Sequence, residues 1–301
     1  MQSSQIPPAM ISEERTRPIR FIKILLFSAS IIPTLVAGAL AFADGYSNLA
    51  WLILAGIGLF IGQAGGDYLY YYFTHFHTDT RDAHTKIFAG WKPLFAGSWL
   101  KNEHTLQAGI VCLMIALVIG VYFYLQLGAA VLILALAGGL IAIFFTPLMM
   151  RGFKEPVVFL TFGPLSMLGV DYVLTQQFRL EPLIASLPIG FLVTLVAYLK
   201  GAHFRIKEDS DSSIILNLKP NTAVVLLALA YLTLIAGASS KYLEPAVLLG
   251  LLTLPFAVIL VKKLKTYKKI SDYLWATVYA LLVFIITGLL MAAGFLNSVY
   301  W

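Results

Sequence analysis

Charge and cysteine are both scarce in this sequence. Only 12% of its 301 residues are Asp, Glu, Lys or Arg, whereas 59% are hydrophobic. A water-soluble domain needs a more polar surface than this composition can supply. The single cysteine, Cys112, cannot form an internal disulfide, which excludes a disulfide-stabilised fold. The composition therefore predicts an integral membrane protein that lies in the lipid bilayer.

Long hydrophobic runs recur along the whole chain, and each can cross about 30 Å of hydrocarbon as a helix. We therefore predict an all-α fold, a polytopic membrane bundle of nine transmembrane helices. The predicted spans are residues 20–43, 49–73, 105–126, 128–148, 155–176, 182–201, 222–239, 242–262 and 273–297. The first run is full length and follows the basic segment SEERTRPIRFIK, so we expect a retained helix rather than a cleaved signal peptide. Residues 1–19 are then a tail, and residues 20–301 one membrane domain.

Positive charge is expected almost entirely on one side of this bundle. Of the 21 Lys and Arg residues, all but Arg179 and Lys241 belong to the amino-terminal tail or to linkers on the same side as that tail. Cytoplasmic segments of membrane proteins carry such an excess of cations. The amino terminus is therefore predicted to be cytoplasmic and the carboxy terminus to lie on the opposite side. The net charge of +6 then reflects topology and not nucleic-acid binding.

All five histidines and most acids fall on the same predicted cytoplasmic side, where residues 74–104 and 202–221 form the two linkers that stand out by their polar content. Asp67 lies about six residues inside the apolar run that precedes the first of them. An ionisable side chain at that depth is costly unless it faces a wet cavity or a cation, so it marks a candidate site. The nearby Gly65 and Gly66 are explained more simply by close helix packing.

Acids and cations from both linkers could meet at this face. The first linker contains HTDTRD, and the second contains GAHFRIKEDSDSS at residues 201–213. Either cluster alone would be interpreted as a solvated loop. Together with Asp67, however, they suit a diphosphate that is held through magnesium, because this cation prefers oxygen ligands and bridges to phosphate oxygens.

Four stretches resemble the UbiA superfamily of intramembrane prenyltransferases, most in the pattern of its dihydroxynaphthoate branch. GGDYLYYY at residues 65–72 lies where the family has its first aspartate motif. TKIFAGWKPLFAG at 85–97 is similar to the segment around an RPL tripeptide, with Lys92 in place of Arg. RGFKEPVVFLTFGPLSMLGVDYVLTQQ at 151–177 is the most specific match, and HFRIKEDSDSS at 203–213 corresponds to the second motif, NNxRDxExD.

The chain also departs from the family pattern. In the first motif, the family's Asn and second Asp fall on Gly66 and Tyr70. In the second motif, the two Asn and the Asp after Arg fall on Ala202, His203 and Ile206. Half of the usual magnesium ligands are thus replaced, and neighbouring acids are the candidates to substitute for them.

The resemblance implies magnesium-dependent transfer of a prenyl group from a prenyl diphosphate to a hydrophobic aromatic acceptor in quinone-type lipid biosynthesis. The implied catalytic residues are Asp67, Arg205 and Glu155, and the implied magnesium ligands are Asp67, Asp79, Glu208 and Asp209. The implied diphosphate-binding residues are Lys86, Lys92 and Arg205, the cavity-lining residues Tyr68, Tyr70 and Tyr71, and the secondary candidates Asp82, Asp211 and His203.

Other functions were weighed against this one. A terpene cyclase of the same superfamily, or a degenerate relative that binds lipid without turnover, would fit the altered motifs. The segment HFHTDTRDAH superficially resembles the histidine boxes of membrane di-iron enzymes, but five histidines are too few for such a site. A transporter should carry polar groups across the bilayer, whereas here only Asp171 lies away from the polar face.

Overall fold

The nine predicted spans correspond to helical segments of the computed structural model. It describes residues 22, 28–76, 93, 100–201, 204–206, 214–216, 219–267 and 270–297. The helices are α2 (Ser28–Ala43), α3 (Leu49–Phe76), α5 (Thr105–Leu127), α6 (Ala129–Met150), α7 (Lys154–Leu160), α8 (Ser166–Thr175), α9 (Leu180–Lys200), α10 (Pro220–Ser239), α11 (Leu254–Thr266) and α12 (Ile270–Asn297). Three shorter helical segments are η2 (Asn102–His104), η3 (Thr161–Leu165) and η4 (Pro245–Thr253).

The prediction of an all-α polytopic membrane bundle is confirmed. Within the described ranges, eight helices are long and apolar enough to cross a membrane, and α2 is a shorter apolar helix of 16 residues. One predicted span is formed by α7, the π-helical turn η3 and α8 in succession, and another by the 3-10 helix η4 and α11. The short antiparallel pair β1 (Phe204–Ile206) and β2 (Ile214–Leu216), with Arg205 opposite Ile215, was not predicted.

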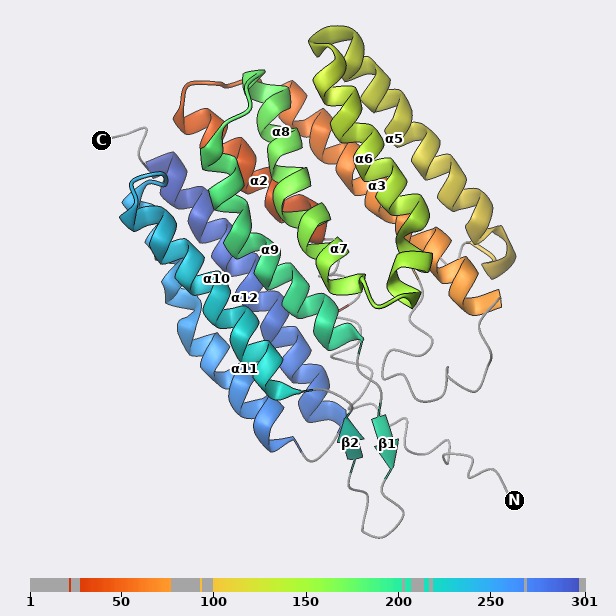
Figure 1. Ribbon diagram of the computed structural model, residues 1–301, viewed down its shortest axis with the longest axis vertical. Helices are drawn as coiled ribbons and strands as arrows, with labels where there is room; N and C mark the ends of the chain where they lie inside the picture. Colours follow the sequence, from red (N-terminus) through yellow and green to blue (C-terminus); the bar gives the residue numbers. More distant parts are fainter. Residues whose placement is uncertain are drawn as a thin grey trace.

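The bundle has two ends with different connections (Figure 1). The lower end in that view, which we call the hairpin end, carries β1 and β2 and the links from α6 to α7 and from α11 to α12. The upper end, which we call the Arg179 end, carries the links from α2 to α3, from α5 to α6 and from α8 to α9. This alternation agrees with the two sides expected from the nine-span prediction.

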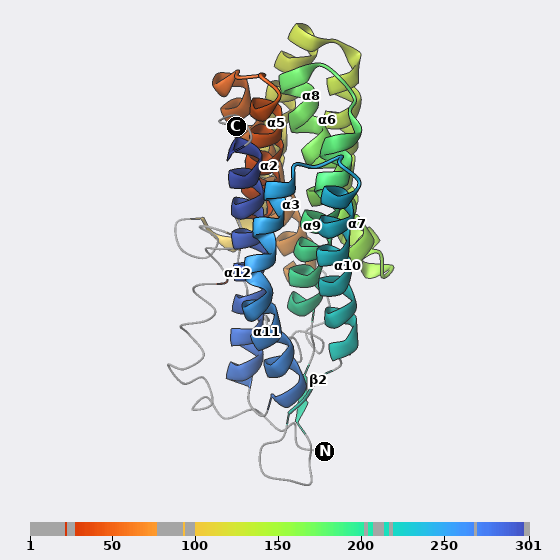
Figure 2. The same cartoon turned by 90° about the vertical axis from the view of Figure 1, so that its left-hand side faces the viewer.

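Helix α12 forms the centre of one half of the molecule. It packs against α2, α9, η4 and α11, as the turned view of Figure 2 shows in part. Its side chains Tyr273, Phe284 and Phe295 are among the largest that are fully buried. Helices α5 and α6 instead pack mainly on α3 and each other and expose large apolar side chains, among them Val118 and Leu125. Such an apolar outer surface suits hydrocarbon rather than water.

Gly294 of α12 lies against the backbone of η4, and this contact leads to a stability prediction. A Cβ at this position would lie 2.6 Å from the carbonyl oxygen of Ala246 and 2.7 Å from its carbonyl carbon. Because backbone cannot rotate away as a side chain can, we expect Gly294→Ala to lower the free energy of unfolding by about 1–3 kcal/mol. Thermal unfolding in detergent measures this effect.

The control is Gly139→Ala in α6. A Cβ there meets no heavy atom within 4 Å, and alanine is the better helix former by about 1 kcal/mol. The control should therefore match or exceed the wild type in unfolding temperature. Equal unfolding temperatures for Gly294→Ala and the control would contradict the packing described for α12 and η4.

Candidate functional site

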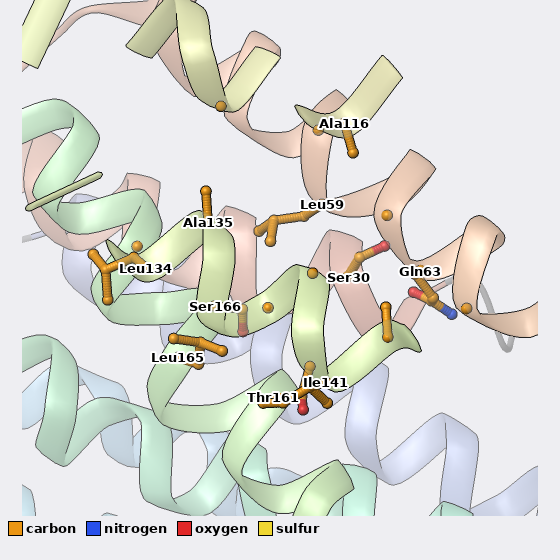
Figure 3. A pocket seen from close by; sticks show the side chains of 18 of the residues that line it. Ser30, Leu59, Gln63, Ala116, Leu134, Ala135, Ile141, Thr161, Leu165 and Ser166 are labelled. Atoms are coloured by element: carbon orange, nitrogen blue, oxygen red, sulfur yellow. The ribbon is translucent and has the colours of Figure 1, made fainter. Parts of the chain in front are cut away.

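A cavity of about 450 Å³ lies between α3, α5, α6 and the segment from α7 to α8, with Ser30 of α2 on its wall (Figure 3). Most of its lining side chains are aliphatic or aromatic. It extends along α3 between two residues. Asp67 lies nearer the hairpin end, and Ala55 lies nearer the Arg179 end. A long apolar cavity of this size is able to hold a hydrophobic ligand.

Several glycines line the cavity. Gly58, Gly62 and Gly66 follow one face of α3, and the other walls contribute Gly139 of α6 and Gly169 of α8. A Cβ added at Gly139 or Gly169 would meet no heavy atom within 4 Å. Larger residues at Gly139 and Gly169 would therefore occupy open space beside the cavity, whereas Gly58, Gly62 and Gly66 lie against side chains of α5 and α6.

A few polar side chains interrupt the apolar lining of the cavity. Among the described lining residues, Asp67 is the only acid, and it accepts a hydrogen bond from the side chain of Gln63. Thr161 donates its hydroxyl hydrogen to the carbonyl of Val157 at 2.7 Å, which leaves its oxygen able to accept a bond from a ligand. Asp67 is thus the charged end of an otherwise apolar space.

Two lysines lie close to the end of α9 at the hairpin end. Lys200, the last residue of α9, is near enough to attract Asp67 electrostatically. Lys154 donates a hydrogen bond of 2.5 Å from α7 to the carbonyl of Ala197, and its Nζ would be only 2.8 Å from a Cβ at Gly201. Sequence reasoning treated both lysines as topological charges and did not find that Lys200 lies near Asp67. The available signal was the position of Lys154 inside the stretch RGFKEP and of Lys200 three residues before HFRIKED.

The three tyrosines that were predicted to line the cavity lie outside its described walls. Tyr68 and Tyr71 pack instead with Ala64, Leu100, Ala108 and Cys112. The ring of Tyr70 meets that of Phe145 edge-on, with ring centroids 5.9 Å apart. Phe145 lines the cavity, whereas Tyr70 does not. Tyr68, next to Asp67, points about 100° away from it, whereas Tyr70 and Tyr71 lie about one turn beyond Asp67, which is the last residue of α3 on the described cavity wall.

The structure brings only part of the predicted site together. Asp67 lines the cavity, and Glu155 is half-buried in the first turn of α7 at the hairpin end, outside the cavity lining. Arg205 lies in β1, but only its backbone is described. The predicted residues outside the described ranges are Asp79, Asp82, Lys86, Lys92, His203, Glu208, Asp209 and Asp211.

A complete magnesium site is not formed by the residues that the structure describes. No group of three or more His, Cys, Asp or Glu residues is found among them in an arrangement that could hold a metal ion. Asp67 supplies one oxygen ligand of the kind that magnesium prefers. Further ligands would have to come from the two linkers that follow α3 and α9.

No protein-family model matches the chain, and no curated protein is significantly similar to it. The likeness to the UbiA superfamily therefore rests on the resemblance of individual stretches of this sequence and on the predicted helix arrangement. The geometry around Asp67 and the cavity has to carry the functional argument independently of that likeness.

A second charged cluster, which we call the Arg179 clasp, lies at the opposite end and consists of Arg179, Asp171 and Asp44. Nε of Arg179 donates to Oδ2 of Asp171 at 3.0 Å, Nη2 bonds to Oδ1 of the same carboxylate, and Nη1 bonds to Asp44. Burial disfavours the charged guanidinium, but these bonds outweigh that effect and raise the pKa of Arg179 above its usual value. The clasp joins the end of α2 to α8.

Sequence reasoning identified Asp171 as an exception to the one-sided polarity but did not find its partner. Asp171 is only 1% exposed, so an unpaired charge there would be strongly unfavourable. The bidentate bonds from Arg179 satisfy both carboxylate oxygens, and the Tyr46 ring lies 5.9 Å from the guanidinium carbon. The arrangement explains Asp171 as part of a structural tie rather than of a transport path.

Proposed function

We propose that this chain is an intramembrane prenyltransferase that moves a prenyl group from a prenyl diphosphate to a hydrophobic aromatic acceptor, with Mg²⁺ as cofactor, in quinone-type lipid biosynthesis. The single observation that carries the proposal is an apolar cavity that ends at Asp67, beside Lys200. A prenyl diphosphate has the same division into a long hydrocarbon and one charged end.

The chain connectivity supports the same assignment. The linker that contains Asp79 and Asp82 leaves the end of α3, and the linker that contains Glu208 and Asp209 leaves the end of α9. Both helices end at the hairpin end, and Asp67 lies at the end of the cavity that is nearer to it. The two linkers that carry these acids therefore both leave the bundle at the end nearer to Asp67.

The proposed chemistry begins with rupture of the allylic carbon–oxygen bond, and the leaving diphosphate takes the electron pair. Magnesium, when bound, neutralises the charge that builds on this group. Lys200 adds positive charge at the same end of the cavity. The apolar walls exclude water from the allylic cation, so an aromatic carbon of the acceptor forms the new carbon–carbon bond and then loses its proton.

The test is turnover by the purified protein in lipid nanodiscs with magnesium and prenyl diphosphates, with and without dihydroxynaphthoate. We expect diphosphate release and a prenylated acceptor, measured by mass spectrometry. Diphosphate release with an acceptor-free hydrocarbon would favour a terpene cyclase instead. Binding of prenyl diphosphates without any release would indicate a lipid-binding relative, and either outcome would overturn the transferase assignment.

The hairpin end is proposed to face the cytoplasm, because every described Lys and Arg except Arg179 and Lys241 lies at that end. Lys219 and Lys241 are exposed at opposite ends and provide a matched pair for a test. In a Cys112→Ala background, a membrane-impermeant maleimide added to intact cells should label Lys241→Cys and not Lys219→Cys. The reverse labelling pattern would invert the proposed orientation.

A further inference from the structure

The end of the cavity farthest from Asp67 is closed by an aromatic pair. Phe123 of α5 lines the cavity there and is only 3% exposed. Its ring packs edge-on against Trp51 of α3, with centroids 6.2 Å apart and planes at 86°. Ala55 and Val131 complete this end from α3 and α6. A chain that enters from the Asp67 end therefore meets a packed wall.

The distance between the two ends sets a length for the occupant. Asp67 and Ala55 are twelve residues apart on one helix, which corresponds to about 18 Å at 1.5 Å per residue. Three bonds of an extended chain span about 3.5 Å, so the four bonds of one isoprene unit span about 4.7 Å. The cavity length thus matches about four isoprene units.

The cavity volume gives a second estimate from a different quantity. A methyl or methylene group is close in size to a water molecule, whose share of liquid volume is about 30 Å³. A cavity of about 450 Å³ is then filled by about fifteen such groups, which is three isoprene units. Length and volume therefore agree on a chain of about three to four units.

We infer that the cavity holds one isoprenoid chain of about three to four units, with its phosphorylated end at Asp67, and that Phe123 determines the longest chain that fits. The inference rests on the proposed function, because it assigns the cavity to the prenyl chain of the diphosphate substrate. Phe123 acts as a specificity-determining residue, since it forms the wall that the last isoprene unit contacts.

The experiment measures binding and not turnover. Thiolodiphosphate analogues, in which sulfur replaces the bridging oxygen and prevents release, are made with prenyl chains of two, three, four and nine units. Their affinity for the protein in nanodiscs with magnesium is measured by native mass spectrometry. We expect the three- and four-unit analogues to bind best and the nine-unit analogue about tenfold or more weakly, which is the penalty of overpacking.

Two variants should move this limit in opposite directions. Phe123→Ala removes the wall and should extend the best-bound chain by about one unit, the size of the deleted ring. Gly169→Leu adds a side chain where a Cβ meets no heavy atom within 4 Å, and it should shorten the preferred chain. Phe144→Ala is the matched control, because this residue of α6 is 53% exposed and lies outside the cavity lining.

Equal affinity for all chain lengths, or the same preference in both variants as in the control, would overturn the inference while leaving the transferase proposal intact. A length limit that moves as expected in a protein without turnover would support the inference and refute the transferase. Lack of binding by every analogue would overturn both.

Discussion

Replacement of Asp67 by asparagine should reduce diphosphate release by about 100-fold or more, without loss of the folded protein. Asparagine has nearly the same shape and retains an oxygen that can accept from Gln63, so the packing of α3 is expected to persist. It removes the only carboxylate on the described cavity wall. Release kinetics with a prenyl diphosphate, together with thermal unfolding, measure the two effects separately.

Glu103→Gln is the control for this substitution. Glu103 lies near the hairpin end in η2, pairs at 3.8 Å with Lys101 and is largely exposed, so its loss changes the same charge outside the cavity lining. Near-normal release is expected for the control. Comparable rates in Asp67→Asn and Glu103→Gln would exclude Asp67 from the chemistry.

A double substitution distinguishes a catalytic Asp67 from one that merely neutralises Lys200. If Asp67 only balances the lysine charge, removal of both charges in Asp67→Asn/Lys200→Met should restore the activity that Asp67→Asn loses. If Asp67 acts on the diphosphate through magnesium, the double variant should be no more active than the single one. We expect the second result, because Asp67 supplies the only carboxylate on the described cavity wall.

Arg179→Met should lower the free energy of unfolding by about 3–5 kcal/mol, since it leaves the buried carboxylate of Asp171 without its partner. Methionine retains much of the hydrocarbon of arginine and no charge. Unfolding in a denaturing detergent, followed by tryptophan fluorescence, measures the loss. The double variant Asp171→Asn/Arg179→Met should recover most of it, because no charge then remains buried between Asp171 and Arg179.

Lys241→Met provides the comparison for the clasp. Lys241 is exposed at the same end of the bundle, so its substitution removes an equal charge with little effect on stability. A loss of stability in Arg179→Met no larger than in Lys241→Met would show that the clasp does not hold α2 to α8.

The helical spans were predictable because length and hydropathy decide whether a segment can cross hydrocarbon. The local hydrogen-bonding pattern within a span could not be predicted in this way. Pro164 lacks an N–H group, and the chain around it, Thr161–Leu165, adopts a π-helical turn that hydropathy cannot distinguish from α-helix. The β1–β2 pair was hidden for a related reason, since strands of three residues leave almost no periodic signal.

The candidate site shows a similar division. Asp67 was found because a charge within an apolar run is unusual at the level of sequence alone. The placement of Lys200 beside Asp67, and of Arg179 beside Asp171, depends on how separate helices pack. Each cation looked like an ordinary charge near a helix end. The tyrosines were predicted from their proximity in sequence to Asp67, but Tyr68 lies on another face of α3, and Tyr70 and Tyr71 lie one turn beyond the described cavity wall.

The most direct test of the account is an experimental structure of the protein in nanodiscs with magnesium and the thiolodiphosphate analogue of four isoprene units. We predict that the diphosphate lies at Asp67 and Lys200 and that the hydrocarbon follows α3 towards Phe123. An analogue bound at the Arg179 end, or a chain that lies outside the cavity between α3 and α8, would contradict the assignment of this cavity as the prenyl-binding site.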